Sequence, residues 1–174
     1  MVRSSLRVWL FVGLLASVAH AQYAPHSLGL GPQLTTVLGS RSVMWGLSLE
    51  FSQYLESGFE FVVRVPVLIA DVPVGADTAS GAGKVFATGG SLGVRYLFLE
   101  GLVRPWVGLQ LSGVVLITRP EVSWFLGAGT TLGLDWVLSE SWSIGARGSY
   151  DVFVDLNRPW RHQLGGSLVA CVLF

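Results

Sequence analysis

The stretch QLGGSLVACVLF, from Gln163 to Phe174, decides the predicted fold of this chain of 174 residues. Every second side chain from Leu164 onward is apolar or glycine, and the stretch ends on an aromatic ring. Because successive side chains of a β-strand point to opposite faces of a sheet, this alternation predicts a strand with one apolar face.

The same alternation recurs along the chain and predicts eight strands, which are separated by turn signals rich in glycine. The predicted ranges are 27–38, 43–53, 58–69, 85–99, 105–117, 122–137, 142–154 and 162–174. Each range exceeds the length of about five or six residues that is usual in soluble sheets, and suits a strand that crosses a membrane at a tilt. After residue 21, no uninterrupted apolar run reaches the ~18 residues of a transmembrane helix.

In hydrocarbon, every backbone polar group must be paired within the protein, which leaves helices and closed barrels as the structures that span a membrane. We therefore predict an all-β fold, an eight-stranded antiparallel up-and-down transmembrane β-barrel. The short turns 54–57, 100–104 and 138–141 fall at one end with both termini. The connections 39–42, 70–84, 118–121 and 155–161 fall at the other end, and of these only 70–84 is long.

The first 21 residues have the pattern of a secretory signal peptide. Arg3 and Arg7 precede an apolar segment at 8–18, and Ala19-His20-Ala21 forms a small-x-small cleavage site. The apolar segment is too short for the alternative, a retained anchor helix. The predicted domains are therefore the signal peptide, 1–21, and one barrel, 22–174.

Composition excludes several functional classes. The chain has 11 Lys and Arg against 11 Asp and Glu, and removal of Arg3 and Arg7 with the leader gives a formal charge of −2, which disfavours nucleic acid as a partner. Cys171 is the only cysteine, so the sequence offers neither an internal disulfide nor a metal framework. We expect no cofactor and no metal. Cys171 has inward phase and is interpreted as a small core residue.

Charged residues in the middle of the predicted strands share the phase opposite to the apolar face. A lipid-facing charge would cost about 2–4 kcal/mol near the membrane midplane, so these side chains are expected to point inward and to pair. The expected interior charge network comprises Glu50, Glu60, Arg64, Arg95, Asp135, Arg147 and Asp151. It is interpreted as a structural plug, because eight strands leave room for side chains and not for a wide channel; a narrow or gated ion path is the functional alternative.

Aromatic residues gather near both ends of the predicted strands. Their amphipathic rings favour the headgroup level of a membrane, which predicts two girdles; ordinary core aromatics of a soluble fold are the alternative. The girdle at the end that holds the termini comprises Tyr54, Tyr96, Phe98, Trp106, Trp136, Trp142 and Phe174. The girdle at the other end comprises Trp45, Phe86, Trp124, Phe153 and Trp160.

Together, the leader, the alternation, the segment Arg104 to Leu109 and the terminal pattern from Leu164 resemble the small eight-stranded bacterial outer-membrane barrels of the OmpA transmembrane-domain and OmpX kind. The resemblance covers 23–174. It implies that the end with the termini is periplasmic and that the barrel-assembly machinery reads the C-terminal aromatic, Phe174. Departing from the OmpA pattern, the sequence predicts no peptidoglycan-binding domain. It also predicts no long surface loops, which disfavours an adhesin role.

Catalytic and binding constellations are sparse. His162 lies near Asp155 in sequence, which gives at most half of a triad, and no serine stands beside His162; both His162 and His26 are interpreted as solvated histidines. The rim residues Arg119, Arg158 and Arg161, with Trp160, offer guanidinium groups to lipopolysaccharide phosphates.

The sequence therefore favours a monomeric, non-enzymatic outer-membrane barrel with a structural or surface-interaction role. Its expected partners are the outer-membrane lipids and the assembly machinery. The alternatives are a narrow channel or a barrel that transports or binds small molecules, a surface lipid-modifying enzyme, and a soluble lipocalin-like barrel.

Overall fold

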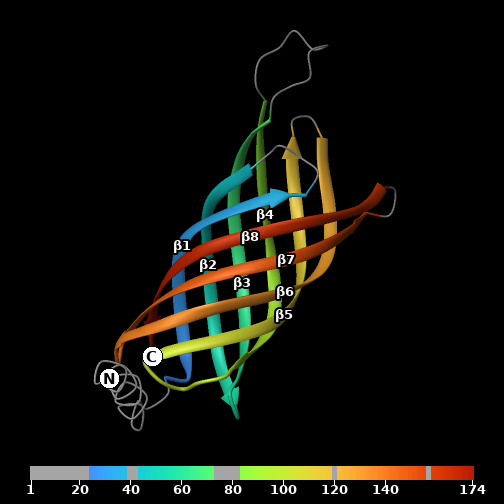
Figure 1. The fold of residues 1–174 in the computed structure, drawn as a ribbon. Helices are drawn as coiled ribbons and strands as arrows, with labels where there is room; N and C mark the ends of the chain where they lie inside the picture. Colours follow the sequence, from blue (N-terminus) through green and yellow to red (C-terminus); the bar gives the residue numbers. More distant parts are fainter. Residues whose placement is uncertain (1–23, 39–42, 73–82, 119–120, 156–157) are drawn as a thin grey trace, which may run out of the picture.

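The computed structural model describes residues 24–38, 43–72, 83–118, 121–155 and 158–174. These residues form one closed barrel in which each strand pairs with the next and the last pairs with the first (Figure 1). The strands are β1 (His26–Val37), β2 (Val43–Glu56), β3 (Phe59–Val72), β4 (Gly83–Leu97), β5 (Val103–Thr118), β6 (Glu121–Ser139), β7 (Trp142–Asp155) and β8 (Arg158–Leu173). All pairings are antiparallel, which confirms the predicted all-β up-and-down barrel.

Pairing between β1 and β8 closes the sheet. Ser27 lies opposite Leu173, and Val37 lies opposite Gln163. At the end of this seam, the backbone N–H of His26 donates to the carbonyl of Phe174 and the N–H of Phe174 donates back, both at 3.0 Å. Closure removes the two edges that an open sheet would expose. We call the end of the barrel that contains Phe174 the turn end, and the opposite end the loop end.

A two-residue turn joins β2 to β3 at the turn end. Ser57 and Gly58 both have positive φ, 55° and 85°. This is the geometry of a type I′ hairpin, whose twist matches that of the strands it joins. The N–H of Leu97 donates to the carbonyl of Gly58 at 2.8 Å, so the turn is also tied to β4.

Several strands are longer at the loop end than the sequence predicts. β3 and β4 continue to the pair Val72–Gly83, and β8 begins at Arg158 and not at His162. The prediction ended these strands where polar and small residues become frequent. Such residues indicate exposure to water, and backbone pairing continues through them.

Two prolines interrupt the ladder without ending a strand. Pro32 keeps its register with Leu47 of β2, whereas the pairing of β1 with β8 skips Gly31 and Pro32. Pro66 is likewise in register with β2, and the β3–β4 pairing skips it. Since proline has no N–H to donate, each gap falls on one side of its strand only.

The distribution of side chains is the reverse of that in a soluble protein. Large apolar side chains on the outer face are exposed, with Leu126 at 75%, Trp124 at 73% and Leu109 at 69%. In contrast, Glu50 is 1% exposed and Ser48 is fully buried inside the barrel. In the described part of the chain, no helix is long and apolar enough to cross a membrane.

The inward glycines allow close approach of neighbouring strands, and a substitution of Gly46 tests this role. A Cβ added to Gly46 would overlap the carbonyl of Val67 on β3, whereas one added to the outward Gly90 would meet nothing nearer than 3.8 Å. We expect Gly46→Ala to lower the free energy of unfolding by about 1–3 kcal/mol, since the added methyl group would force the backbones of β2 and β3 apart. The matched Gly90→Ala should change it by less than about 0.5 kcal/mol. Urea titration in detergent micelles measures both, and equal shifts would contradict the assignment of the inner face.

Candidate functional site

Charged side chains form one layer across the lumen, in the half of the barrel nearer the turn end. At its centre, the carboxylate of Glu50 on β2 is contacted from three other strands. Arg64 of β3 donates to Glu50 Oε2 through Nε at 3.1 Å and through Nη2 at 3.0 Å. Arg95 of β4 donates to Oε1 at 3.3 Å, and Arg147 of β7 pairs with Oε2 across the lumen.

A second part of the layer joins β3 and β4 to β6. Glu60 pairs with the Nε of Arg95. Asp135 lies 3.7 Å from Nη1 of Arg95 and 3.5 Å from Nη2 of Arg147. Three arginines thus meet three carboxylates, and the layer is formally neutral. A buried ion is stable only when partners replace its water, and here each of these ions has at least one partner of opposite charge.

Trp106 belongs to this layer, which corrects its assignment to the aromatic girdle. Its side chain is 3% exposed, and its indole N–H donates to Asp135 Oδ2 at 3.0 Å. The guanidinium of Arg95 lies 4.9 Å from the ring centroid, within the range of a cation–π contact. Trp106 has the same phase as Gln110, which lies two positions further along the same face of β5 after Gly108 and bonds to Asp151 inside the barrel. The alternation of side chains on β5 therefore indicated that Trp106 points inward, although its position near a strand end suggested the girdle.

Asp151 lies inside the barrel but apart from the arginines. It is 4% exposed, and its Oδ1 accepts hydrogen bonds from Gln110 Nε2 at 2.7 Å and from Ser112 Oγ at 3.1 Å. Within the described residues, no cation forms an ion pair with it. The structure thus brings six of the seven expected charges into one network and holds the seventh with neutral donors.

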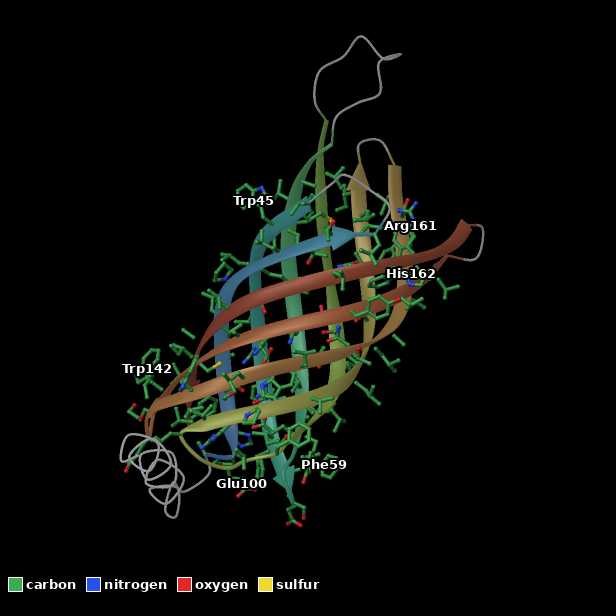
Figure 2. The ribbon with its side chains drawn as sticks, in the orientation of Figure 1. Trp45, Phe59, Glu100, Trp142, Arg161 and His162 are labelled. Carbon is green, nitrogen blue, oxygen red and sulfur yellow. The ribbon has the colours of Figure 1, made fainter. Side chains whose placement is uncertain are left out.

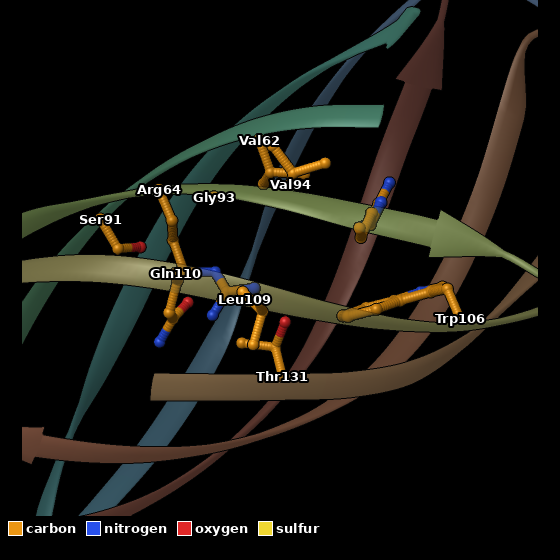
Figure 3. A pocket seen from close by; sticks show the side chains of 10 residues that line it. Val62, Arg64, Ser91, Gly93, Val94, Trp106, Leu109, Gln110 and Thr131 are labelled. Atoms are coloured by element: carbon orange, nitrogen blue, oxygen red, sulfur yellow. The ribbon is translucent and has the colours of Figure 1, made fainter. Parts of the chain in front are cut away.

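The charged layer leaves almost no free space. A cavity of about 10 Å³ lies beside it, bounded by Arg64, Ser91, Gln110, Trp106 and Thr131 among others (Figure 3). This is room for about one water molecule.

An apolar layer fills the lumen nearer the loop end. Its core is the buried cluster Met44, Leu68, Ala70, Val85 and Ala87. The rings of Phe125 and Phe153, each 5% exposed, lie in the same half of the barrel and border a cavity of about 30 Å³ with Met44. Phe153 was expected in the loop-end girdle and faces inward instead. This layer therefore narrows the lumen a second time, on the loop side of the charged layer.

Arg161 was expected at the outer rim, with Arg119, Arg158 and Trp160. The structure turns Arg161 toward the inside, where it borders a cavity with Phe125 and Phe153 and its guanidinium lies 5.1 Å from the centroid of the Phe125 ring. Arg161 therefore covers the apolar layer from the loop end. Arg119 and the side chains of Arg158 and Trp160 lie outside the described residues.

Most of the other girdle residues lie on the outer face. Trp45 and Trp142 project outward near opposite ends of the barrel (Figure 2), and they are 56% and 52% exposed. The outward set also includes Phe86, Tyr96, Phe98, Trp124, Trp136 and Phe174. Tyr54 differs, because it is half-buried and its hydroxyl donates to Glu100 at 2.9 Å and accepts from the N–H of Gly58 at 3.1 Å. Tyr54 thus links two turns and does not extend into the girdle.

The two histidines of the barrel lie at opposite ends of it, with His26 on β1 at the turn end and His162 on β8 near the loop end. Both belong to strands and contact aromatic rings, so neither is a simple solvated loop residue. His26 stacks on Phe51 with ring centroids 6.0 Å apart, and contacts Phe174 at 5.8 Å. His162 lies on the outer face near the loop end, where its Nδ1 is 2.6 Å from the hydroxyl of Tyr150. The described residues contain no group of three or more His, Cys, Asp or Glu that could hold a metal. Cys171 is buried, with its sulfur 3.6 Å from Nη2 of Arg147.

The central role of Glu50 can be tested by removing its charge. Glu50→Gln leaves three arginines with two carboxylates, and we expect it to lower the free energy of unfolding by about 3–5 kcal/mol. The control Glu140→Gln, in an exposed turn, should change it by less than about 0.5 kcal/mol. Because Arg147→Gln removes the opposite charge, the double variant should lose less than the sum of the two single losses. Additive losses in urea titrations would contradict a direct Glu50–Arg147 coupling.

No family model and no curated protein matches this sequence. Its structure is similar to the crystal structure of Neisserial surface protein A, with a TM-score of 0.58, 18% identity, and coverage of 86% of this chain and 97% of that one. It is also similar to the attachment invasion locus protein Ail of Yersinia pestis, crystallised with the heparin analogue sucrose octasulfate, with a TM-score of 0.56, 13% identity, and coverage of 86% and 97%. At such identities the likeness concerns the fold. The chain has the fold of the small eight-stranded outer-membrane barrels, as its sequence predicts.

Proposed function

We propose that this chain is an integral outer-membrane barrel, without a wide pore, that has a structural or surface-interaction role. The observation that carries the proposal is the inverted distribution of its side chains. A continuous outer surface of exposed leucine, valine and aromatic side chains surrounds an interior in which four arginines and four carboxylates are buried. A soluble protein rarely exposes so large an apolar surface, whereas hydrocarbon stabilises it. This distribution is also the reverse of what a lipocalin-like barrel requires.

The proposed partners follow from the same surface. The outward aromatic side chains near both ends suit the headgroup regions of a bilayer, with Phe174 at the periplasmic boundary and Trp45 near the outer one. The proposed barrel is monomeric, and Phe174 is the residue through which the assembly machinery recognises the closing strand. Lipopolysaccharide contacts at the outer rim remain part of the proposal through Arg158 and Arg119.

Membrane fractionation tests the location. We expect the chain to sediment with outer membranes, to resist extraction by carbonate, and to migrate faster on gels before boiling than after it, since a closed barrel stays folded in dodecyl sulfate. Phe174→Ala should lower the amount of the heat-modifiable form, because the terminal ring is lost. A monomer that is soluble without detergent would overturn the proposal.

The closed lumen separates this role from that of a channel. The charged layer and the apolar layer lie one above the other, and the cavities beside them measure about 10 and 30 Å³. We therefore expect the purified barrel to show no steady single-channel conductance in planar bilayers. Conductance that disappears on changing Arg64 or Arg147 would instead support a narrow channel that passes through the charged layer.

We further propose that the barrel is not an enzyme. Tyr150 is the partner of the His162 ring, and His26 lies between Phe51 and Phe174, so the described contacts give neither histidine an orienting carboxylate. Ser27 follows His26 in the sequence, and its hydroxyl bonds to that of Ser52 inside the barrel. A change in lipid A that depends on the chain and is lost in His162→Ala would refute this.

A further inference from the structure

The outer face of the barrel has a groove where the last two hairpins meet the first strand. Its volume is about 390 Å³, and it spans β6, β7, β8 and β1. Every residue that lines it is apolar or glycine. The volume falls within the range of roughly 300–1,000 Å³ that is typical of ligand pockets, whereas the cavities in the lumen are far smaller.

Short side chains on β7 and β8 create this groove. Ala170 lies opposite Ile144, and Ala146 lies opposite Leu168, so each alanine leaves a gap beside a long neighbour. Trp136 flanks the gap on one side. On the other side, Leu30 is in register with Ala170 across the seam, next to the interruption of the β1–β8 ladder at Pro32.

Outward positions without long side chains continue from the groove toward the middle of the barrel. Gly148 lies opposite Gly166, and both are outward-facing. A Cβ added to either glycine would meet nothing nearer than 3.9 Å, so packing within the barrel does not require glycine there. This contrasts with Gly31 on the inner face, where an added Cβ would overlap the carbonyl of Leu168. The glycine pair continues the row of short outward side chains from Ala146 toward mid-strand, beyond the residues that line the groove.

We propose that this groove binds one acyl chain of a phospholipid in the periplasmic leaflet. The inference rests on the proposed membrane location and names a lipid site within it. The groove is continuous with the apolar outer surface, and Trp136, 47% exposed, marks its headgroup end. None of its lining side chains carries a charge that would hold a headgroup. Since neighbouring strands lie about 4.8 Å apart, a groove one or two strands wide suits a single extended chain better than the convex face of another barrel.

Photolabelling in vesicles tests the site against simple exposure. The barrel is reconstituted in phosphatidylethanolamine and phosphatidylglycerol that contain a phospholipid with a diazirine halfway along one acyl chain. Labelled residues are then mapped by peptide mass spectrometry. Leu109, Leu111 and Leu126 are 69%, 67% and 75% exposed, and Leu168 is 62% exposed. We expect labelling of Leu168 and Ile144 to exceed that of these leucines several-fold, whereas labelling in proportion to exposure would overturn the proposal.

A variant that fills the groove provides the second measurement. Ala170→Phe should abolish the excess label on Ile144 and Leu168, and the matched Ala128→Phe, on the outer face of β6, should leave it unchanged. Heat-modifiable mobility of both variants shows that each barrel is folded. Crosslinks between two barrels through Leu168, with no excess of lipid label, would indicate a second copy as the occupant and would refute the lipid site. An absence of label at every outward leucine would overturn the membrane location itself, and so distinguishes the two failures.

Discussion

The rest of the structure depends on closure of the sheet between β1 and β8. In hydrocarbon an unpaired backbone group costs several kcal/mol, so a sheet with free edges would not be stable there. The reciprocal hydrogen bonds between His26 and Phe174 fix the register at the end of the seam. Because side chains alternate with a period of two, that register decides for every residue whether it faces lipid or lumen. A shift by one residue would place the arginines in the hydrocarbon.

The same alternation explains why the lumen is divided into two layers. Inward positions nearer the turn end carry charged residues such as Glu50 and Arg95, and those nearer the loop end carry residues such as Leu68 and Phe153. The charged layer makes the interior specific, since each ion there needs partners at defined positions. The apolar layer separates it from the side that faces the cell exterior in the proposed orientation. A barrel built in this way has a well-ordered interior and a closed lumen.

The sequence predicts the fold, the strand order and the inward phase of the charged residues, because all three follow from periodicity and turn spacing. The predictions are wrong where the preference of aromatic residues for the membrane boundary was given more weight than the alternation of side chains between the two faces. Trp106 and Phe153 were assigned to the membrane boundary because they are aromatic and near strand ends, although their phase points inward. Asp151 was expected to pair with arginine, since phase gives the face of a residue but not its neighbours across the lumen. The apolar layer and the outer groove depend on which strands meet in space, and a single sequence does not encode that directly.

Some ion pairs in the charged layer join strands that are close neighbours in the sheet, whereas others join strands on opposite sides of the barrel. Glu50, Arg64 and Arg95 come from β2, β3 and β4, so they can meet in a partly formed sheet. Arg147 comes from β7 and reaches Glu50 only across the finished lumen. Until the barrel closes, Arg147 has Asp135 of the neighbouring strand as a partner but not Glu50, and Glu50 lacks one of its three arginines, in a medium that stabilises ions poorly. The full set of ion pairs therefore forms only when the sheet closes between β1 and β8, which makes the final step of assembly cooperative.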